Sequence, residues 1–115
     1  MDLMRYVNGR DVVSFDAGAT IFTKGDPGTA MYIIASGEVE LTDGARTVRI
    51  GPGESFGEMA LIDRRPRSTD AVAVVPTELA SISQGLFLVL IQETPYFALE
   101  IMHSLTERLR AASQG

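Results

Sequence analysis

Hydrophobic and polar residues alternate over short runs through the first 82 residues of the chain, which predicts β-strands. In Glu38-Val39-Glu40-Leu41 this alternation gives a strand one face in water and one in a core. Turn residues separate the runs at about 8–12-residue spacing, the pattern of a sandwich or barrel. The predicted strands cover residues 12–15, 20–23, 31–36, 38–42, 47–50, 55–56, 71–75 and 78–82.

The pattern becomes helical after residue 83. Residues 86–93 are mostly apolar, and Thr94-Pro95 then has the form of an N-cap followed by proline in the first helical turn. Apolar positions from there to about residue 112 recur every three or four residues, which predicts a second helix. One series is predicted to pack on the strands and comprises Phe97, Ile101 and Leu105. The other is a heptad-like seam that comprises Ala98, Met102, Leu105 and Leu109.

No linker or repeat divides the chain, so the 115 residues predict one domain. We expect a β-roll over about 12–82 and helices over about 84–112, with a short helix before residue 12. The N-terminus is too polar for a signal peptide, and the longest apolar run, 86–91, is too short to span a bilayer. We therefore expect a cytoplasmic protein that does not enter membranes.

Composition argues against catalysis and against a metal centre. The chain has no cysteine, which excludes disulfides, zinc–thiolate sites and cysteine nucleophiles. His103 is the only histidine, so a small cupin-like enzyme with several histidine ligands is the weaker alternative. No serine lies in a nucleophile-elbow motif. We therefore expect no catalytic residues, no metal and no cofactor.

Charge favours a small anionic ligand over a nucleic acid. The net charge is −5 and Lys24 is the only lysine. The one basic cluster is formed by Arg64, Arg65 and Arg67. A nucleic-acid-binding domain would usually present a broader basic face. Arg64 and Arg65 are interpreted as a solvated loop, and Arg67 as the residue that meets the anion.

Residues 53–69 carry the most informative motif, in which Glu58 and Arg67 flank a short turn that begins with glycine. Anions bind where the N–H groups of a helix start converge with an arginine. Sugar hydroxyls need an acceptor, and a carboxylate supplies two oxygens. A small ligand with both a phosphate and a ribose would satisfy both groups. The alternatives are that Glu58 supports the turn and that Arg67 pairs at the surface with Asp63 or Asp70.

The order of these features resembles the cyclic nucleotide-binding domain family. The resemblance rests on Gly53-Glu54-Ser55-Phe56-Gly57-Glu58-Met59-Ala60-Leu61 followed by Pro66-Arg67-Ser68-Thr69. It implies a mainly β fold, an eight-stranded antiparallel β-roll (a jelly roll, or double-stranded β-helix) followed by two α-helices. It further implies a regulatory module that binds cyclic AMP or cyclic GMP and signals through its C-terminal helices.

The resemblance also implies roles for individual residues. Glu58 would accept a hydrogen bond from the ribose 2′-hydroxyl, and Arg67 would pair with the cyclic phosphate. Gly57 and the start of a short helix would present N–H groups to the phosphate, and Ser68 and Thr69 would contact the phosphate or the base. The ligand-binding residues implied in this way are Phe56, Gly57, Glu58, Met59, Ala60, Arg67, Ser68 and Thr69.

Two points stay open in the sequence. Asp70 lies close to Arg67, and an inward-pointing carboxylate there would compete for the arginine and repel a phosphate. A degenerate domain that binds no nucleotide and acts as a protein-interaction scaffold is therefore an alternative. Ser68 leaves the choice of base open, with a lean to cyclic AMP by analogy with bacterial regulators.

The expected partners are a cyclic nucleotide, an unknown effector protein and a second copy of the chain, paired through the seam.

Overall fold

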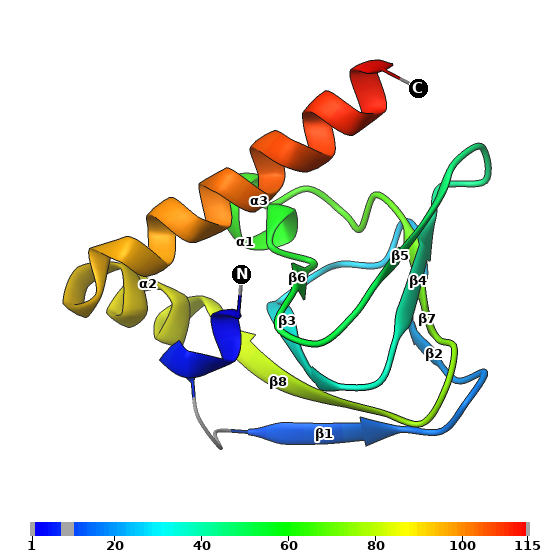
Figure 1. Cartoon of the computed structure of the whole chain (residues 1–115), viewed down its shortest axis with the longest axis horizontal. Helices are drawn as coiled ribbons and strands as arrows, with labels where there is room; N and C mark the ends of the chain where they lie inside the picture. The colour runs from blue at the N-terminus through cyan, green and yellow to red at the C-terminus, as the bar shows by residue number, and fades with distance from the viewer. Residues whose placement is uncertain (1, 8–10, 115) are drawn as a thin grey trace.

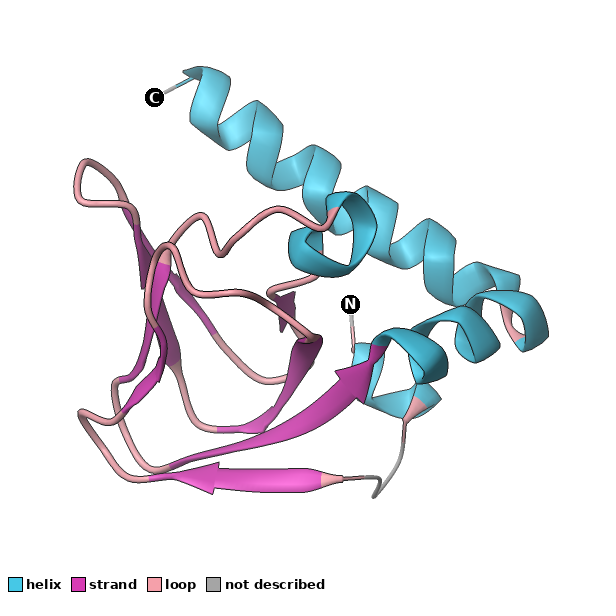
Figure 2. Cartoon of the chain, turned by 180° about the vertical axis from the view of Figure 1, so that it is seen from behind, coloured by secondary structure: helices cyan, strands magenta, loops and turns pink. Residues whose placement is uncertain are grey.

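The computed structural model of the chain describes residues 2–7 and 11–114, with side chains described up to Ala111. Strands form one part of the molecule and helices cover another, with α3 running along the outside (Figures 1 and 2). The strands are β1 (Val12–Phe15), β2 (Thr20–Phe22), β3 (Ala30–Ser36), β4 (Val39–Thr42), β5 (Thr47–Ile50), β6 (Ser55–Phe56), β7 (Asp70–Ala73) and β8 (Thr77–Ser83). The helices are η1 (Leu3–Tyr6, a 3-10 turn), α1 (Met59–Asp63), α2 (Gln84–Glu93) and α3 (Pro95–Gln114).

The strands form two four-stranded antiparallel sheets with orders β1-β8-β3-β6 and β2-β7-β4-β5. The predicted fold class, an antiparallel β-roll followed by two α-helices, is confirmed. Strands β1, β5 and β6 have the predicted bounds, while each of the other strands differs from the prediction by one or two residues at one or both ends. The short helix predicted before residue 12 is the 3-10 turn η1.

Two apolar clusters hold these layers together. One lies within the roll and joins both sheets through Phe22, Val39, Phe56 and Leu79. The other lies between the β1-β8-β3-β6 sheet and the helices, and its buried members include Met31 and Ile82 from the strands. Burial of apolar surface on both sides of this sheet fixes the helices against the roll.

The C-terminal helices join this second cluster as the spacing of apolar residues predicted. Phe97 and Ile101 are buried, and Leu105 packs against them while partly exposed. Ser83 is the N-cap residue of helix α2, and its hydroxyl accepts a hydrogen bond from the Leu86 N–H at 3.2 Å.

The N-terminal turn is tied to the start of α3. The Arg5 guanidinium donates to the Glu100 carboxylate at 2.7 Å, and the Tyr6 ring meets the Phe97 ring edge to face at 5.4 Å. In the described part of the chain, no single helix is both long and apolar enough to cross a membrane. Helices α2 and α3 reach that length and apolar character only when taken together, and they are bent by 113° relative to each other.

Candidate functional site

The motif at residues 53–69 comprises β6 and the compact turn that follows it, which contains α1 and leads to β7. Gly57 follows β6 with a φ of +79°, a conformation that glycine adopts without strain. Glu58 is the N-cap residue of α1, and α1 ends at Arg64 in the left-handed conformation. The backbone of Arg67 then pairs with the β2–β3 loop, since its N–H donates to the Asp26 carbonyl at 2.8 Å and its carbonyl accepts from the Gly25 N–H at 2.9 Å.

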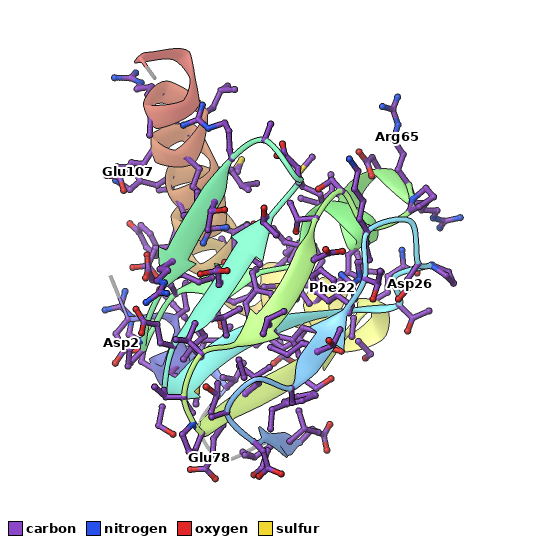
Figure 3. All side chains as sticks on the ribbon, turned by 90° about the vertical axis from the view of Figure 1, so that its right-hand side faces the viewer. Asp2, Phe22, Asp26, Arg65, Glu78 and Glu107 are labelled. Carbon is purple, nitrogen blue, oxygen red and sulfur yellow. The ribbon has the colours of Figure 1, made fainter. Side chains whose placement is uncertain are left out.

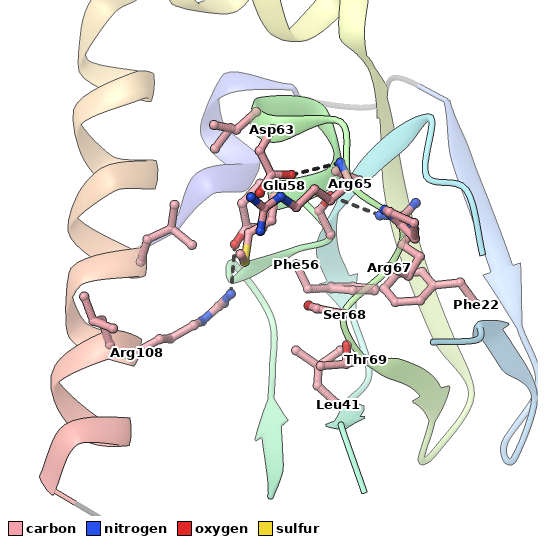
Figure 4. A pocket seen from close by; sticks show the side chains of 17 residues that line it. Phe22, Leu41, Phe56, Glu58, Asp63, Arg65, Arg67, Ser68, Thr69 and Arg108 are labelled. Carbon is pink, nitrogen blue, oxygen red and sulfur yellow. Dashed lines mark hydrogen bonds and ion pairs between the residues drawn. The ribbon is translucent and has the colours of Figure 1, made fainter. Parts of the chain in front are cut away.

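This turn forms one wall of a cavity of about 660 Å³, and the last turns of α3 form another (Figure 4). The volume lies within the range of about 300–1,000 Å³ that is typical of small-molecule sites. All eight residues expected at a ligand site line this cavity: Phe56, Gly57, Glu58, Met59, Ala60, Arg67, Ser68 and Thr69. The structure therefore brings the predicted set together in one place.

Glu58 lies at the back of this cavity and is only 2% exposed. Its Oε1 accepts a hydrogen bond from Arg108 of α3 at 3.1 Å, and its Oε2 is buried with no hydrogen-bond partner among the described residues. Its side chain makes no cap hydrogen bond to α1, so the alternative role of Glu58 as a cap of this turn has no support in the structure. A buried carboxylate oxygen without a donor is costly, and a hydroxyl entering the cavity would satisfy it.

Arg67 is also buried, with 7% of its surface exposed. Its two terminal nitrogens donate to main-chain carbonyls, Nη1 to Gly57 at 3.0 Å and Nη2 to Ala30 at 2.7 Å. The guanidinium carbon lies 4.1 Å from the centre of the Phe22 ring, in a cation–π contact. The alternative that Arg67 is a surface residue is wrong.

No acidic residue of the described chain forms an ion pair with Arg67. Burial lowers the pKa of the Arg67 guanidinium, while the more distant Tyr32, Asp26 and Glu58 raise it. A buried cation that contacts only neutral carbonyls and a ring lacks a counterion. An anion in the cavity would supply one.

The acids suspected of competing for Arg67 are engaged elsewhere. Asp70 accepts a hydrogen bond from the Lys24 N–H at 2.7 Å, and Asp63 accepts one from the Arg65 N–H at 3.0 Å. Asp70 does not line the cavity. The competition between Asp70 and a phosphate that the sequence left open is therefore absent from this structure.

Several residues of the cavity were missed in the sequence. Arg108 shares a helix face with Leu105, three positions earlier, and that spacing was the only sequence signal for it. Arg65, interpreted as part of a solvated loop, is exposed but also lines the cavity; its side chain extends away from the strands, whereas Phe22 lies among them (Figure 3). The other lining residues that were not predicted there are Phe22, Leu41, Ile62, Asp63, Pro66, Leu105 and Leu109.

The charges around the cavity favour an anion. Three arginines and two acids line it, so an excess of one positive charge lies inside a chain of net charge −5.

Among the side chains that the structure describes, no group of three or more His, Asp or Glu residues is arranged to hold a metal ion. The remaining walls are mainly apolar, as a flat heterocyclic base requires.

The fold and the site together define a β-roll domain with an arginine-lined cavity, one wall of which is a C-terminal helix. The sequence profile of the family described as "Cyclic nucleotide-binding domain" matches residues 12–94. The chain belongs to this family, and the resemblance seen in the sequence is confirmed.

Relatives of known sequence and structure agree with this assignment. The chain is 42% identical over 104 residues to the "Cyclic AMP receptor protein" of Thermus thermophilus, which covers 85% of this chain and 48% of that protein. The crystal structure of the Thermus thermophilus catabolite activator protein superposes with a TM-score of 0.81 and 37% identity, over 97% of this chain and 54% of that one. A structure described under "A cyclic-GMP-dependent signalling pathway regulates bacterial phytopathogenesis" superposes with a TM-score of 0.79 and 27% identity. The match covers 95% of this chain and 89% of that one. The chain spans about half the length of the first two curated relatives it matches.

Proposed function

We propose that this chain is a regulatory module that binds a purine cyclic nucleotide in the cavity beneath α3, with cyclic AMP as the favoured ligand. The observation that carries the proposal is the pair of unsatisfied buried groups on one wall. Arg67 is a cation without an acidic partner among the described residues, and Glu58 Oε2 is an acceptor without a donor there. A cyclic phosphate and a ribose 2′-hydroxyl are the complementary pair.

Each part of the nucleotide has a suitable wall. The planar fork of Arg67 suits two phosphate oxygens, and the first N–H groups of α1 have no acceptor inside the helix. Leu41, Leu105 and Leu109 offer apolar surface to the base, with the Thr69 hydroxyl nearby. The predicted roles of the eight motif residues are retained within this proposal.

The choice of cyclic AMP rests on relatives. The Thermus thermophilus relative and the Yarrowia lipolytica regulatory subunit, 44% identical over 73 residues, are both named for cyclic AMP. One structural neighbour is described by a cyclic-GMP-dependent pathway, so cyclic GMP is the second candidate. Ser68, which directly follows Arg67, is compatible with either base.

Calorimetric titration tests the proposal. We expect saturable binding of cyclic AMP, weaker binding of 2′-deoxy cyclic AMP because Glu58 Oε2 would lose its donor, and little binding of acyclic 5′-AMP. Ligand at about 100 times Kd should raise the melting temperature by about 5 °C or more. No response to either cyclic nucleotide at millimolar concentration would exclude this function and favour the scaffold alternative.

The signal would pass to the C-terminal helices. Arg108 connects the ribose-binding acid to α3, because it donates to both Glu58 and the Ser55 carbonyl. A ligand that enters between α1 and α3 changes the contacts of both helices. It shifts the equilibrium between two positions of α3 by the difference in its affinity for them. The effector that responds is a further protein or a further part of a longer chain. A regulatory rather than a catalytic role follows from this mechanism.

A second copy of the chain is the proposed partner of α3. The predicted seam is not one continuous exposed face, because Ala98 and Leu105 are partly buried. Met102 and Leu109 are 55% and 69% exposed, and Leu99, outside the predicted seam, is 55% exposed. Apolar residues spaced along one helix in this way suit a helix–helix interface.

Substituting Met102 with glutamate should make a dimer monomeric, because a charge would be buried in the interface. Light scattering over a range of protein concentrations measures the change. Leu88→Glu on α2, where the leucine is 58% exposed, is the matched control and should remain dimeric. A wild-type protein that is monomeric at all concentrations contradicts the proposed dimer.

A further inference from the structure

The guanidinium of Arg67 lies in a narrow slot between the β2–β3 loop and α1. One side of the slot is the Phe22 ring, 4.1 Å from the guanidinium carbon. Another is Gly28, where an added Cβ would lie 2.8 Å from both Nε and Cζ of Arg67 and 2.5 Å from the Ala60 Cβ. Real Cβ atoms essentially never approach other heavy atoms so closely, so a side chain at residue 28 would force Arg67 or Ala60 to move.

Space, and not backbone conformation, is what Gly28 provides. Its φ lies outside the left-handed region, so this position does not need glycine for a positive φ. Gly57 also adjoins Arg67, but it differs because its φ of +79° favours glycine as well. Gly51 has neither constraint, since nothing lies within 4 Å of a Cβ there and its φ is not positive.

We infer that Gly28 is a positioning residue for the anion pocket: it leaves the space in which the Arg67 guanidinium lies over the Phe22 ring with its two terminal nitrogens donating to two carbonyls. A methyl group at residue 28 would overlap with Nε and Cζ, so the guanidinium would have to leave this place. Both hydrogen bonds of Arg67, to Gly57 and to Ala30, depend on the same position. The Nε of Arg67, buried and without a partner among the described residues, lies on the side that Gly28 keeps open.

This inference rests on the proposed function for its effect on ligand, but its structural part can be measured without any ligand. Arg67 held in a prepared position binds an anion without first having to be ordered. Displacing it should weaken binding of cyclic AMP by about tenfold or more. Gly51→Ala is the control and should bind as the wild type does.

The deciding experiment is a double-mutant cycle in the ligand-free protein. Gly28→Ala is expected to lower the melting temperature, and the drop should be smaller in the Arg67→Ala background, because one of the two overlaps has been removed. The overlap with Ala60 stays in both backgrounds. Where Gly28→Ala alone does not fold, the same comparison is made with Ala60→Gly present, which leaves Arg67 as the close neighbour.

The outcomes separate the two proposals. Equal drops in melting temperature with Arg67 present and in the Arg67→Ala background would overturn the inference, whether or not the protein binds nucleotide. Unequal drops together with normal cyclic AMP binding by Gly28→Ala would overturn its link to the ligand. If the wild-type protein does not bind cyclic nucleotides, the proposed function is refuted. The double-mutant cycle still decides whether Gly28 positions Arg67.

Discussion

Replacing Arg67 with alanine is expected to weaken cyclic AMP binding by at least about a hundredfold, which corresponds to about 2.8 kcal/mol. The residue is 7% exposed and has no acidic partner among the described residues, so the pocket itself does not neutralise its charge. A charge-assisted, two-pronged contact with a phosphate is among the strongest polar contacts a protein makes. Calorimetric titration of the variant, set beside the wild type, measures the loss.

Two further arginine variants make this prediction specific. Arg67→Lys should recover only part of the affinity, because an ammonium lacks the planar fork that matches two oxygens. Arg65→Ala removes an exposed arginine of the same cavity and should reduce affinity only a few-fold, since exposed charges are screened by solvent. If Arg67→Ala binds within about threefold of the wild type, the phosphate is held by other groups.

The strands could be predicted because local chemistry determines them. Residues 12–15, 47–50 and 55–56 form strands with the predicted ends, and each lies between turn residues. The eight predicted site residues lie within one turn and the loop after it, so a continuous sequence motif was enough to group them. The position of Asp70 could also have been found, since strand alternation separates it from the buried Ala71.

The groups that complete the site depend on distant parts of the chain. Helical spacing puts Arg108 on the face of Leu105, but what that face meets depends on the sharp bend between α2 and α3. Arg108 and Glu58 are 50 residues apart, and Gly28 reaches Arg67 from the β2–β3 loop. A single sequence carries no signal for such contacts, because they arise from packing of the helices and loops on the roll.

Replacing Arg108 with alanine is expected to destabilise the ligand-free protein by about 2–3 kcal/mol. The change leaves Glu58, 2% exposed, as a buried carboxylate with neither oxygen paired. Breaking a buried ion pair by removing one partner costs about 3–5 kcal/mol, and this value is reduced here because the Arg108 side chain is 27% exposed. The Ser55 carbonyl would lose its bond from Arg108 as well.

The Arg108 variant also tests whether the pocket controls α3. Hydrogen exchange should become faster over the last turns of α3, since Arg108 makes the ion pair that joins them to the acid of the pocket. Adding Glu58→Gln to Arg108→Ala should recover part of the stability, because an amide is cheaper than a carboxylate to leave unpaired. Arg110→Ala, an exposed arginine on the same helix, is the control and should change neither quantity. A stability loss in Arg108→Ala that Glu58→Gln does not relieve would mean that Arg108 acts through packing alone, and that its ion pair with Glu58 does not stabilise the position of α3.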